Sequence, residues 1–276
     1  MRNKIDERLD DLRESGRKGL MSHVVVGYPS LEAIRELVLA MGEAGVDFIE
    51  LQIPFADSLA DGPTIQVACE RALARGTRVR DAFEIAEDLA GKSVPLLFMA
   101  YSNTVYRYGV EKFCRDAAEA GVSGLIVPDM PLEAAEREGF LASCRRHDLH
   151  NIITLAPTST QERIAKNAAI ASGFVYCMSR QGVTGAQLGL APDVQEYLAR
   201  VRERTTVPMA AGFGISSRER LEKVLPYCDI AVVGSAVIDC IDELGSAGTQ
   251  QQVAAAKGFL ETLAAGLAGA GSPLSL

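Results

Sequence analysis

Short apolar runs alternate with amphipathic stretches along the whole of this 276-residue chain, at intervals of roughly 25–30 residues. Several runs are continuous rather than alternating, which is typical of strands buried on both faces of a parallel sheet. Eight strands are predicted, at Leu20–Gly27, Asp47–Ile53, Val94–Tyr101, Ser123–Val127, Asn151–Leu155, Gly173–Met178, Val207–Ala211 and Asp229–Val233.

The stretches between the strands show apolar residues at helical spacing, and several follow a capping serine or threonine. An additional amphipathic helix over Ile5–Arg13 precedes the first strand and is expected to close the bottom of a barrel. The other predicted helices are Leu31–Ala44, Glu111–Ala120, Leu132–His147, Gln161–Ile170, Asp193–Arg204, Ser217–Val224, Ala236–Glu243 and Gln251–Leu267.

This alternation predicts an α/β fold, a single (β/α)8 TIM barrel with an extra N-terminal helix, over residues 1–267. A doubly wound open sheet is the alternative, because a count of strands does not show whether the sheet closes. The small-residue tail, 268–276, is expected to be flexible. No linker or low-complexity segment divides the chain into further domains.

Composition narrows the functional classes. Hydrophobic residues make up 48% of the chain, enough for a large core, and the net charge of −8 argues against nucleic acids and anionic membranes as partners. Six cysteines without a Cys-x-x-Cys pair, and only three histidines, predict no metal site and favour a reducing cytoplasm. The charged N-terminus is unlike a signal peptide, and no apolar run is long enough to span a membrane.

A carboxylate interrupts the second predicted strand. Glu50 lies in the otherwise apolar run 48–53, and burial of an ionised carboxylate is costly unless it is paired or faces a cavity. It is therefore either a salt-bridged structural residue or a general acid or base. Side chains alternate along a strand, so Gln52 is expected to share the face of Glu50 and either narrow the pocket or hydrogen-bond Glu50.

The loop after this strand carries two more carboxylates, Asp57 and Asp61. By itself, Asp61-Gly62-Pro63 is typical of a turn that leads into a helix with proline at its start. Reactive groups of barrels also lie in the loops that follow the strands. Asp61 is therefore a candidate for chemistry beside Glu50, and both interpretations stay open on local grounds.

Glycine turns follow the sixth, seventh and eighth predicted strands, at 182–185, 212–217 and 234–235. Glycine lets the backbone approach a ligand closely, and free N–H groups at a helix start attract anions. One such turn is weak evidence, but three of them at these strand ends predict a phosphate site.

Other residues near strand ends carry weaker signals. Tyr176 and His23 lie within predicted strands, where each is more typical of the core than of a ligand contact. Asn103 and Asp129 follow strands and are expected to satisfy loop amides. Arg180 would face either a phosphate or solvent.

Taken together, these motifs resemble the alpha subunit of tryptophan synthase over nearly the whole chain. The most specific motifs are Glu50-Leu51 followed by Leu59-Ala60-Asp61-Gly62-Pro63-Thr64-Ile65-Gln66, and Ser179-Arg180 with Gly182-Val183-Thr184-Gly185 followed by Gly212-Phe213-Gly214-Ile215-Ser216. Further matches are Gly45-Val46-Asp47, Ile53-Pro54-Phe55 and Pro128-Asp129.

The resemblance implies a lyase of tryptophan biosynthesis, which cleaves indole-3-glycerol phosphate to indole and glyceraldehyde-3-phosphate in a retro-aldol step without cofactor or metal. It implies Glu50 as the general acid/base, and Asp61 as the group that holds the indole N–H. The residues expected to bind substrate are Gln52, Tyr101, Tyr176, Thr184, Gly185, Phe213, Gly214, Gly234 and Ser235.

The same resemblance implies a lid over Ser179–Leu190 and a pyridoxal-phosphate beta subunit as partner, in an αββα assembly. The chain departs from the family pattern near its first two strand ends, in the region that docks the beta subunit. These departures bear on the partnership more than on the chemistry. At these positions the chain has Ser22 and His23 where the family usually has a proline and an aromatic residue, Tyr28 where it has aspartate, and Gln52 where it has glycine. Ala56 and Ser58 depart from the pattern in the following loop, and Phe174 stands where tyrosine is common.

Three other functions compete with this one. The nearest is a stand-alone lyase that releases free indole for secondary metabolism. An inactive scaffold that only activates a beta subunit is disfavoured because Glu50 and Asp61 are both present. A different phosphate-binding barrel, such as a metal-dependent epimerase, is disfavoured because the three histidines are too few and badly spaced.

Overall fold

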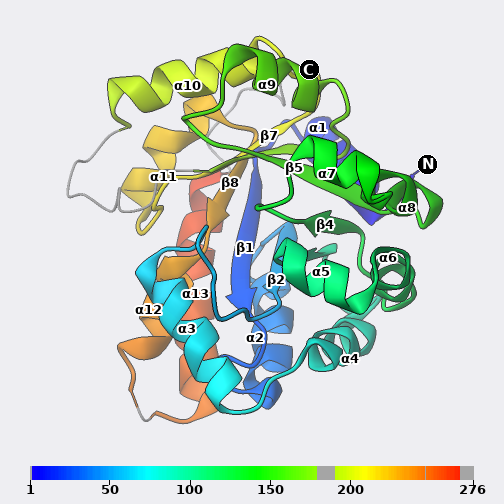
Figure 1. Cartoon of the computed structure of the whole chain (residues 1–276). Helices are drawn as coiled ribbons and strands as arrows, with labels where there is room; N and C mark the ends of the chain where they lie inside the picture. The colour runs from blue at the N-terminus through cyan, green and yellow to red at the C-terminus, as the bar shows by residue number, and fades with distance from the viewer. Residues whose placement is uncertain (1, 179–189, 246, 268–276) are drawn as a thin grey trace.

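A computed structural model of the protein describes residues 2–178, 190–245 and 247–267. Eight parallel strands close into a barrel in sequence order, which confirms the (β/α)8 architecture and is inconsistent with an open doubly wound sheet (Figure 1). The strands are β1 (Gly19–Val25), β2 (Phe48–Gln52), β3 (Leu96–Met99), β4 (Gly124–Ile126), β5 (His150–Leu155), β6 (Val175–Met178), β7 (Met209–Gly212) and β8 (Ile230–Val233).

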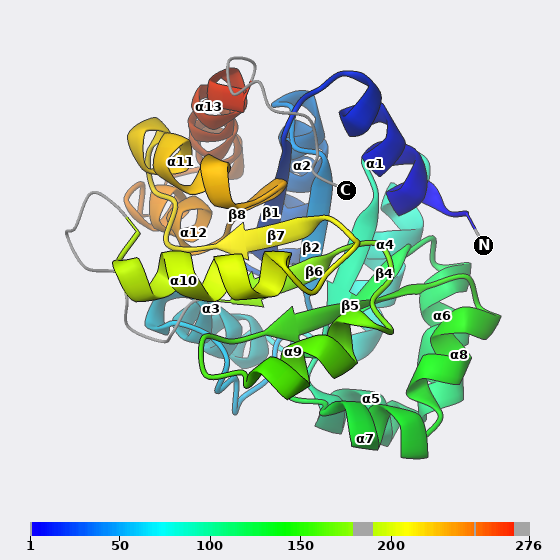
Figure 2. The same cartoon turned by 90° about the horizontal axis from the view of Figure 1, so that it is seen from above.

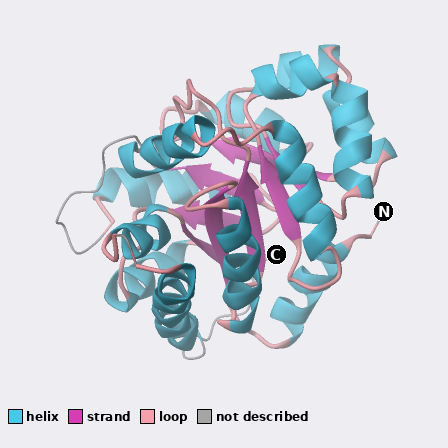
Figure 3. Ribbon diagram, turned by 90° about the horizontal axis from the view of Figure 1, so that it is seen from below, coloured by secondary structure: helices cyan, strands magenta, loops and turns pink. Residues whose placement is uncertain are grey.

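Helices surround this barrel on all sides, as the view from below shows (Figure 3). They are α1 (Lys4–Glu14), α2 (Leu31–Glu43), α3 (Pro63–Ala74), α4 (Val79–Leu89), α5 (Ser102–Tyr108), α6 (Val110–Glu119), α7 (Leu132–Arg137), α8 (Phe140–Arg146), α9 (Gln161–Ala168), α10 (Pro192–Arg202), α11 (Arg218–Val224), α12 (Ser235–Asp242) and α13 (Thr249–Leu267), with a short 3-10 turn, η1 (Leu225–Tyr227). None of the helices in the described ranges is long and apolar enough to cross a bilayer.

The predicted N-terminal helix is present as α1, and it closes the N-terminal end of the barrel (Figure 2). Its apolar face, Ile5, Leu9 and Leu12, is buried together with the side chains that fill the barrel interior. Gly124 leaves the room for this contact, because a Cβ there would lie 2.9 Å from Ile5 Cδ1. This end of the barrel is therefore filled by side chains.

All eight predicted strands are found, and the helices depart from prediction in two ways. The single helix expected over 132–147 is broken into α7 and α8 at Gly139, whose φ of 72° is left-handed and interrupts the helix. The helices α3, α4 and α5 were not predicted. In α3 the start signal was visible, since Pro63 occupies the first turn after Gly62.

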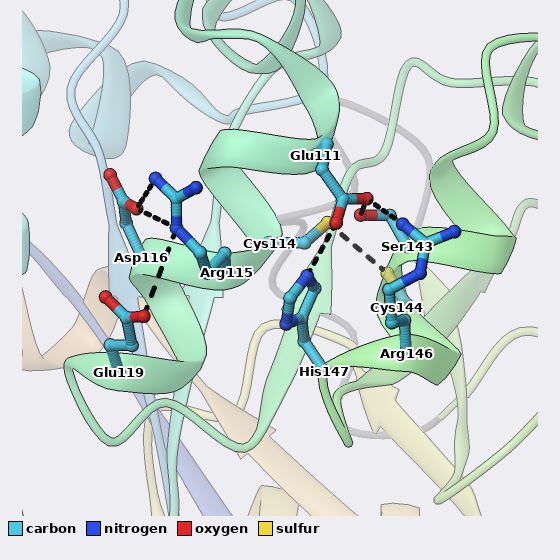
Figure 4. Close-up of polar contacts among 9 residues, drawn as sticks. All are labelled: Glu111, Cys114, Arg115, Asp116, Glu119, Ser143, Cys144, Arg146 and His147. Carbon is cyan, nitrogen blue, oxygen red and sulfur yellow. Dashed lines mark hydrogen bonds and ion pairs between the residues drawn. The ribbon is translucent and has the colours of Figure 1, made fainter.

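Outside the barrel, α6 and α8 are joined through the carboxylate of Glu111 (Figure 4). It accepts hydrogen bonds from the Ser143 hydroxyl at 2.7 Å and from Arg146 at 2.5 Å, and it lies 2.9 Å from His147 Nε2. These interactions, Ser143 first, lower the pKa of Glu111 to about 2. This cluster is structural and lies on the outer helical layer.

Candidate active site

A cavity of about 170 Å³ lies at the C-terminal end of the barrel, where the strands of a barrel enzyme present their reactive groups. Its lining comes from most of the strand ends and the turns after them. The described lining residues are His23, Glu50, Ala60, Asp61, Gly62, Pro63, Ile65, Met99, Ile126, Pro128, Thr154, Tyr176, Met178, Gly212, Gly214, Ile215, Val232, Gly234 and Ser235.

Glu50 reaches this cavity because the pleat of β2 turns every second side chain inward. Phe48, two residues earlier, packs deeper in the barrel against Phe174, with ring centroids 5.6 Å apart. Glu50 is only 2% exposed. Its Oε1 lies 3.4 Å from Nδ1 of His23, the residue opposite it in the β1–β2 register, and its Oε2 has no hydrogen-bond partner within the described protein.

Asp61 approaches the same cavity from the loop between β2 and α3 and is 7% exposed. Its Oδ2 accepts a 2.6 Å hydrogen bond from Gln52 Nε2. Burial raises the pKa of Asp61, and this effect is opposed by the charge of His23 and by hydrogen bonds from Gln52 and Tyr101. The carboxyl is thus desolvated but supplied with donors that favour its ionised form.

The loop that carries Asp61 is fixed by its own motif. Gln66, in the first turns of α3, donates through Nε2 to the carbonyls of Ser58 and Asp61, both at 3.1 Å. The hydroxyl of Tyr101 accepts from the backbone N–H of Ala60 at 3.0 Å. These contacts explain why a loop of small residues holds one geometry.

The expectation for Gln52 was half right. It does share the inward face of β2 with Glu50, but its amide donates to Asp61 and makes no hydrogen bond to Glu50, which corrects that alternative. Gln52 stands at the last residue of the strand, so its side chain reaches the following loop rather than back along β2. It is fully buried and lies behind Asp61, outside the set that lines the cavity.

Two tyrosines were expected to contact substrate. Tyr176 lines the cavity, and its hydroxyl lies against Gly212, where a Cβ would be only 3.1 Å away. Burial, and then the charges of Glu50 and Asp61, hold the pKa of Tyr176 well above its ordinary value, so the hydroxyl stays protonated. Tyr101 instead lies beneath the loop, stacked on Phe55 with centroids 5.3 Å apart.

Two of the three glycine turns predicted to bind phosphate lie within the described residues. Gly214, Gly234 and Ser235 line the cavity, and Gly234 caps α12, so the free N–H groups of that helix start lie at the cavity wall. Gly214 has a φ of +64°, in the left-handed region that favours glycine. Phe213 is partly buried against the core and is not among the lining residues. Thr184, Gly185 and the predicted lid up to residue 189 lie outside the described residues.

His23 is the site residue that sequence reasoning missed, because a lone histidine within a strand is more typical of the core. The β1–β2 register brings its ring opposite Glu50, and that register cannot be read from the residues around His23. By contrast, Asp129 satisfies a loop amide as expected, by accepting from the backbone N–H of Ser102 at 2.7 Å. Across the described ranges, no three histidine, cysteine or acidic side chains gather as metal ligands.

Fold and cavity together are those of a (β/α)8-barrel enzyme with two buried carboxylates at its strand ends. A family model described as tryptophan synthase alpha chain matches residues 9–267. The chain belongs to the tryptophan synthase alpha chain family, and with it to the lyases of tryptophan biosynthesis.

Comparison with individual relatives supports the same family. The tryptophan synthase alpha chain of Desulfotalea psychrophila is 47% identical over 227 residues, which cover 82% of this chain and 89% of that one. The alpha chain of Methanosarcina mazei is 47% identical over 243 residues, 88% of each chain. A solved structure of Mycobacterium tuberculosis tryptophan synthase is similar with a TM-score of 0.87 at 35% identity, and covers 97% of this chain and 99% of its own.

Proposed function

We propose that this chain cleaves indole-3-glycerol phosphate to indole and glyceraldehyde-3-phosphate, with Glu50 as general acid/base and Asp61 as the partner of the indole N–H. The observation that carries the proposal is the convergence of these two buried carboxylates, from β2 and from the loop after it, on one cavity at the strand ends. Family membership supports the same reaction.

The chemistry needs two acidic groups with different tasks. Release of indole requires a proton on ring carbon C3 and loss of a proton from a side-chain hydroxyl, and Glu50 has an oxygen without a protein partner for this exchange. As C3 is protonated, positive charge develops on the ring, and an ionised Asp61 at the indole nitrogen stabilises it. Gln52 and Tyr101 serve this step indirectly, because both hydrogen-bond Asp61.

The other parts of the substrate, including its phosphate, are proposed to contact the other residues that line the cavity. Tyr176 borders the cavity beside Glu50. The phosphate is held through backbone N–H groups by Gly234 and Ser235 at the start of α12, and by Gly214 in the turn after β7. Gly185, Thr184 and Phe213 are proposed as further substrate contacts from the sequence motifs alone.

We further propose that the chain works with a tryptophan synthase beta subunit, because its family is that of the alpha chain of this synthase. A cytoplasmic location stays a prediction from the sequence, with which six free thiols agree. Family membership and the retained core of the loop motif that holds Asp61 favour the synthase over a free lyase.

The test is to incubate the purified chain with indole-3-glycerol phosphate, alone and with the beta subunit of the same organism, and to measure both products. The proposal predicts indole and glyceraldehyde-3-phosphate in equal amounts, and a faster reaction with the beta subunit. Absence of cleavage under both conditions would contradict the proposed reaction. Fast turnover alone, with no stimulation and no complex on gel filtration, would contradict the partnership.

A further inference from the structure

Three titratable side chains share the wall of the cavity, and one of them is unexplained by the proposed reaction. His23, Glu50 and Asp61 are each at most 7% exposed. His23 Nδ1 lies 3.4 Å from Glu50 Oε1, and its Nε2 is buried without a hydrogen-bond partner in the described protein. Among the described lining residues, His23 is the one that can carry positive charge.

The charges decide which form of the ring fits. Two ionised carboxylates in a buried wall repel each other and lose their hydration, and a neutral imidazole would leave both uncompensated. A protonated His23 ring, 3.4 Å from Glu50 Oε1 in the same cavity wall as Asp61, supplies one positive charge. We propose that His23 is a protonated positioning residue, the shared counter-ion of Glu50 and Asp61, which keeps the pair ionised and in place for the cleavage described above.

The groups that face His23 support this assignment. Burial lowers the pKa of His23, but the charge and hydrogen bond of Glu50 and the charge of Asp61 oppose it, and the net pKa is raised. In the turn after β8, the residue next to His23 is Gly234, which has no charged side chain. A Cβ added at Gly234 would lie 3.4 Å from His23 Cβ. Ile65 of α3 is apolar, and Tyr176 of β6 stays neutral.

This role is compatible with proton transfer by Glu50. The Nδ1 proton of His23 faces Glu50 Oε1, so its passage to Glu50 leaves a neutral pair with the same total charge. Glu50 then gives that proton to C3 and takes one from the substrate hydroxyl, which restores the original proton count. The inference rests on the proposed function for its catalytic meaning, but the charge state of His23 does not.

The first experiment therefore needs no substrate. The chain has three histidines, so tag-free protein gives three imidazole signals in NMR, and variants at His147 and His150 identify the third as His23. The His23 signal is expected to titrate above the ordinary value of about 6.5, and its pKa should fall in Glu50→Gln. Glu111→Gln, which removes the carboxylate beside His147 on the outer helices, is the matched control and should leave the His23 signal unchanged.

A His23 pKa below the ordinary value, or one indifferent to Glu50→Gln, would overturn the inference. The second readout is the pH profile of kcat/KM in His23→Gln and His23→Phe. Loss of the positive charge should move the acidic limb upward by about one pH unit in both, because an opposite charge at this range lowers a carboxyl pKa by roughly 1–3. An unshifted limb in both variants would also overturn it, whereas absent cleavage with a raised His23 pKa would contradict only the proposed function.

Discussion

At the scale of single residues, Asp61 has opposite effects on stability and on the proposed chemistry. Burial raises its pKa above the ordinary value, so the native state binds its proton more tightly than the unfolded chain does. The resulting stabilisation is present at low pH and is lost as the pH rises through the native pKa. At neutral pH the ionised Asp61 therefore lowers the free energy of unfolding.

Asp61→Asn should stabilise the protein at pH 7 while it abolishes indole release. A difference of one in pKa between the native and unfolded states corresponds to about 1.4 kcal/mol, and each kcal/mol to roughly 2–4 °C in Tm for a chain of this size. Thermal unfolding at pH 7 and pH 5 measures this, and the gain should be smaller at pH 5. Asp57→Asn, an exposed change in the same loop, is the control and should leave Tm unchanged. A lower Tm for Asp61→Asn at pH 7 would contradict this account.

Some of the site was predictable residue by residue, and some was not. Glu50 was visible because a carboxylate inside an apolar strand demands an explanation, and Asp61 because its loop motif is specific. The hydrogen bond from Gln52 to Asp61 was not, since it depends on how the loop folds back over the end of β2. The pairing of His23 with Glu50 depends on strand register, which the local sequence does not encode.

At the scale of elements, the apolar pattern located every strand, because strands buried on both faces give continuous apolar runs. The apolar pattern gave the wrong prediction where a single glycine ends a helix. The helical spacing of apolar residues over 132–147 continues through Gly139, yet the left-handed φ of that residue separates α7 from α8. A helical pattern therefore does not show whether a glycine inside it is helical.

Two glycine-to-alanine variants test this distinction as a matched pair. A Cβ at Gly139 would meet nothing within 4 Å, so Gly139→Ala should cost about 1 kcal/mol from the left-handed backbone alone. Gly258 lies exposed within α13 and has equal room, so Gly258→Ala should add about 0.4–1 kcal/mol. Urea unfolding measures the free energy of unfolding of both variants. If both substitutions stabilised the protein, or both destabilised it, backbone conformation would not account for the break between α7 and α8.

At the scale of the whole molecule, closure of the barrel assigns different tasks to its two ends. α1 fills the N-terminal end with Ile5, Leu9 and Leu12, whereas side chains that enter the barrel from β1 and β2 near the other end line a cavity. His23 meets Glu50 there because β1 pairs with β2, and Gly234 reaches His23 because β8 pairs with β1. The proposed chemistry is thus a property of the closed fold.

The central claim is that Glu50 transfers the proton in the cleavage of indole-3-glycerol phosphate, and one comparison tests it most directly. Indole release by the wild type is measured against Glu50→Gln, which keeps the size of the side chain, with substrate affinity determined in parallel and Glu111→Gln as the control on the outer helices. The account predicts unchanged affinity and a rate at least ~10² lower for Glu50→Gln, the usual scale for loss of general acid–base catalysis. A rate close to the wild type in Glu50→Gln would contradict it.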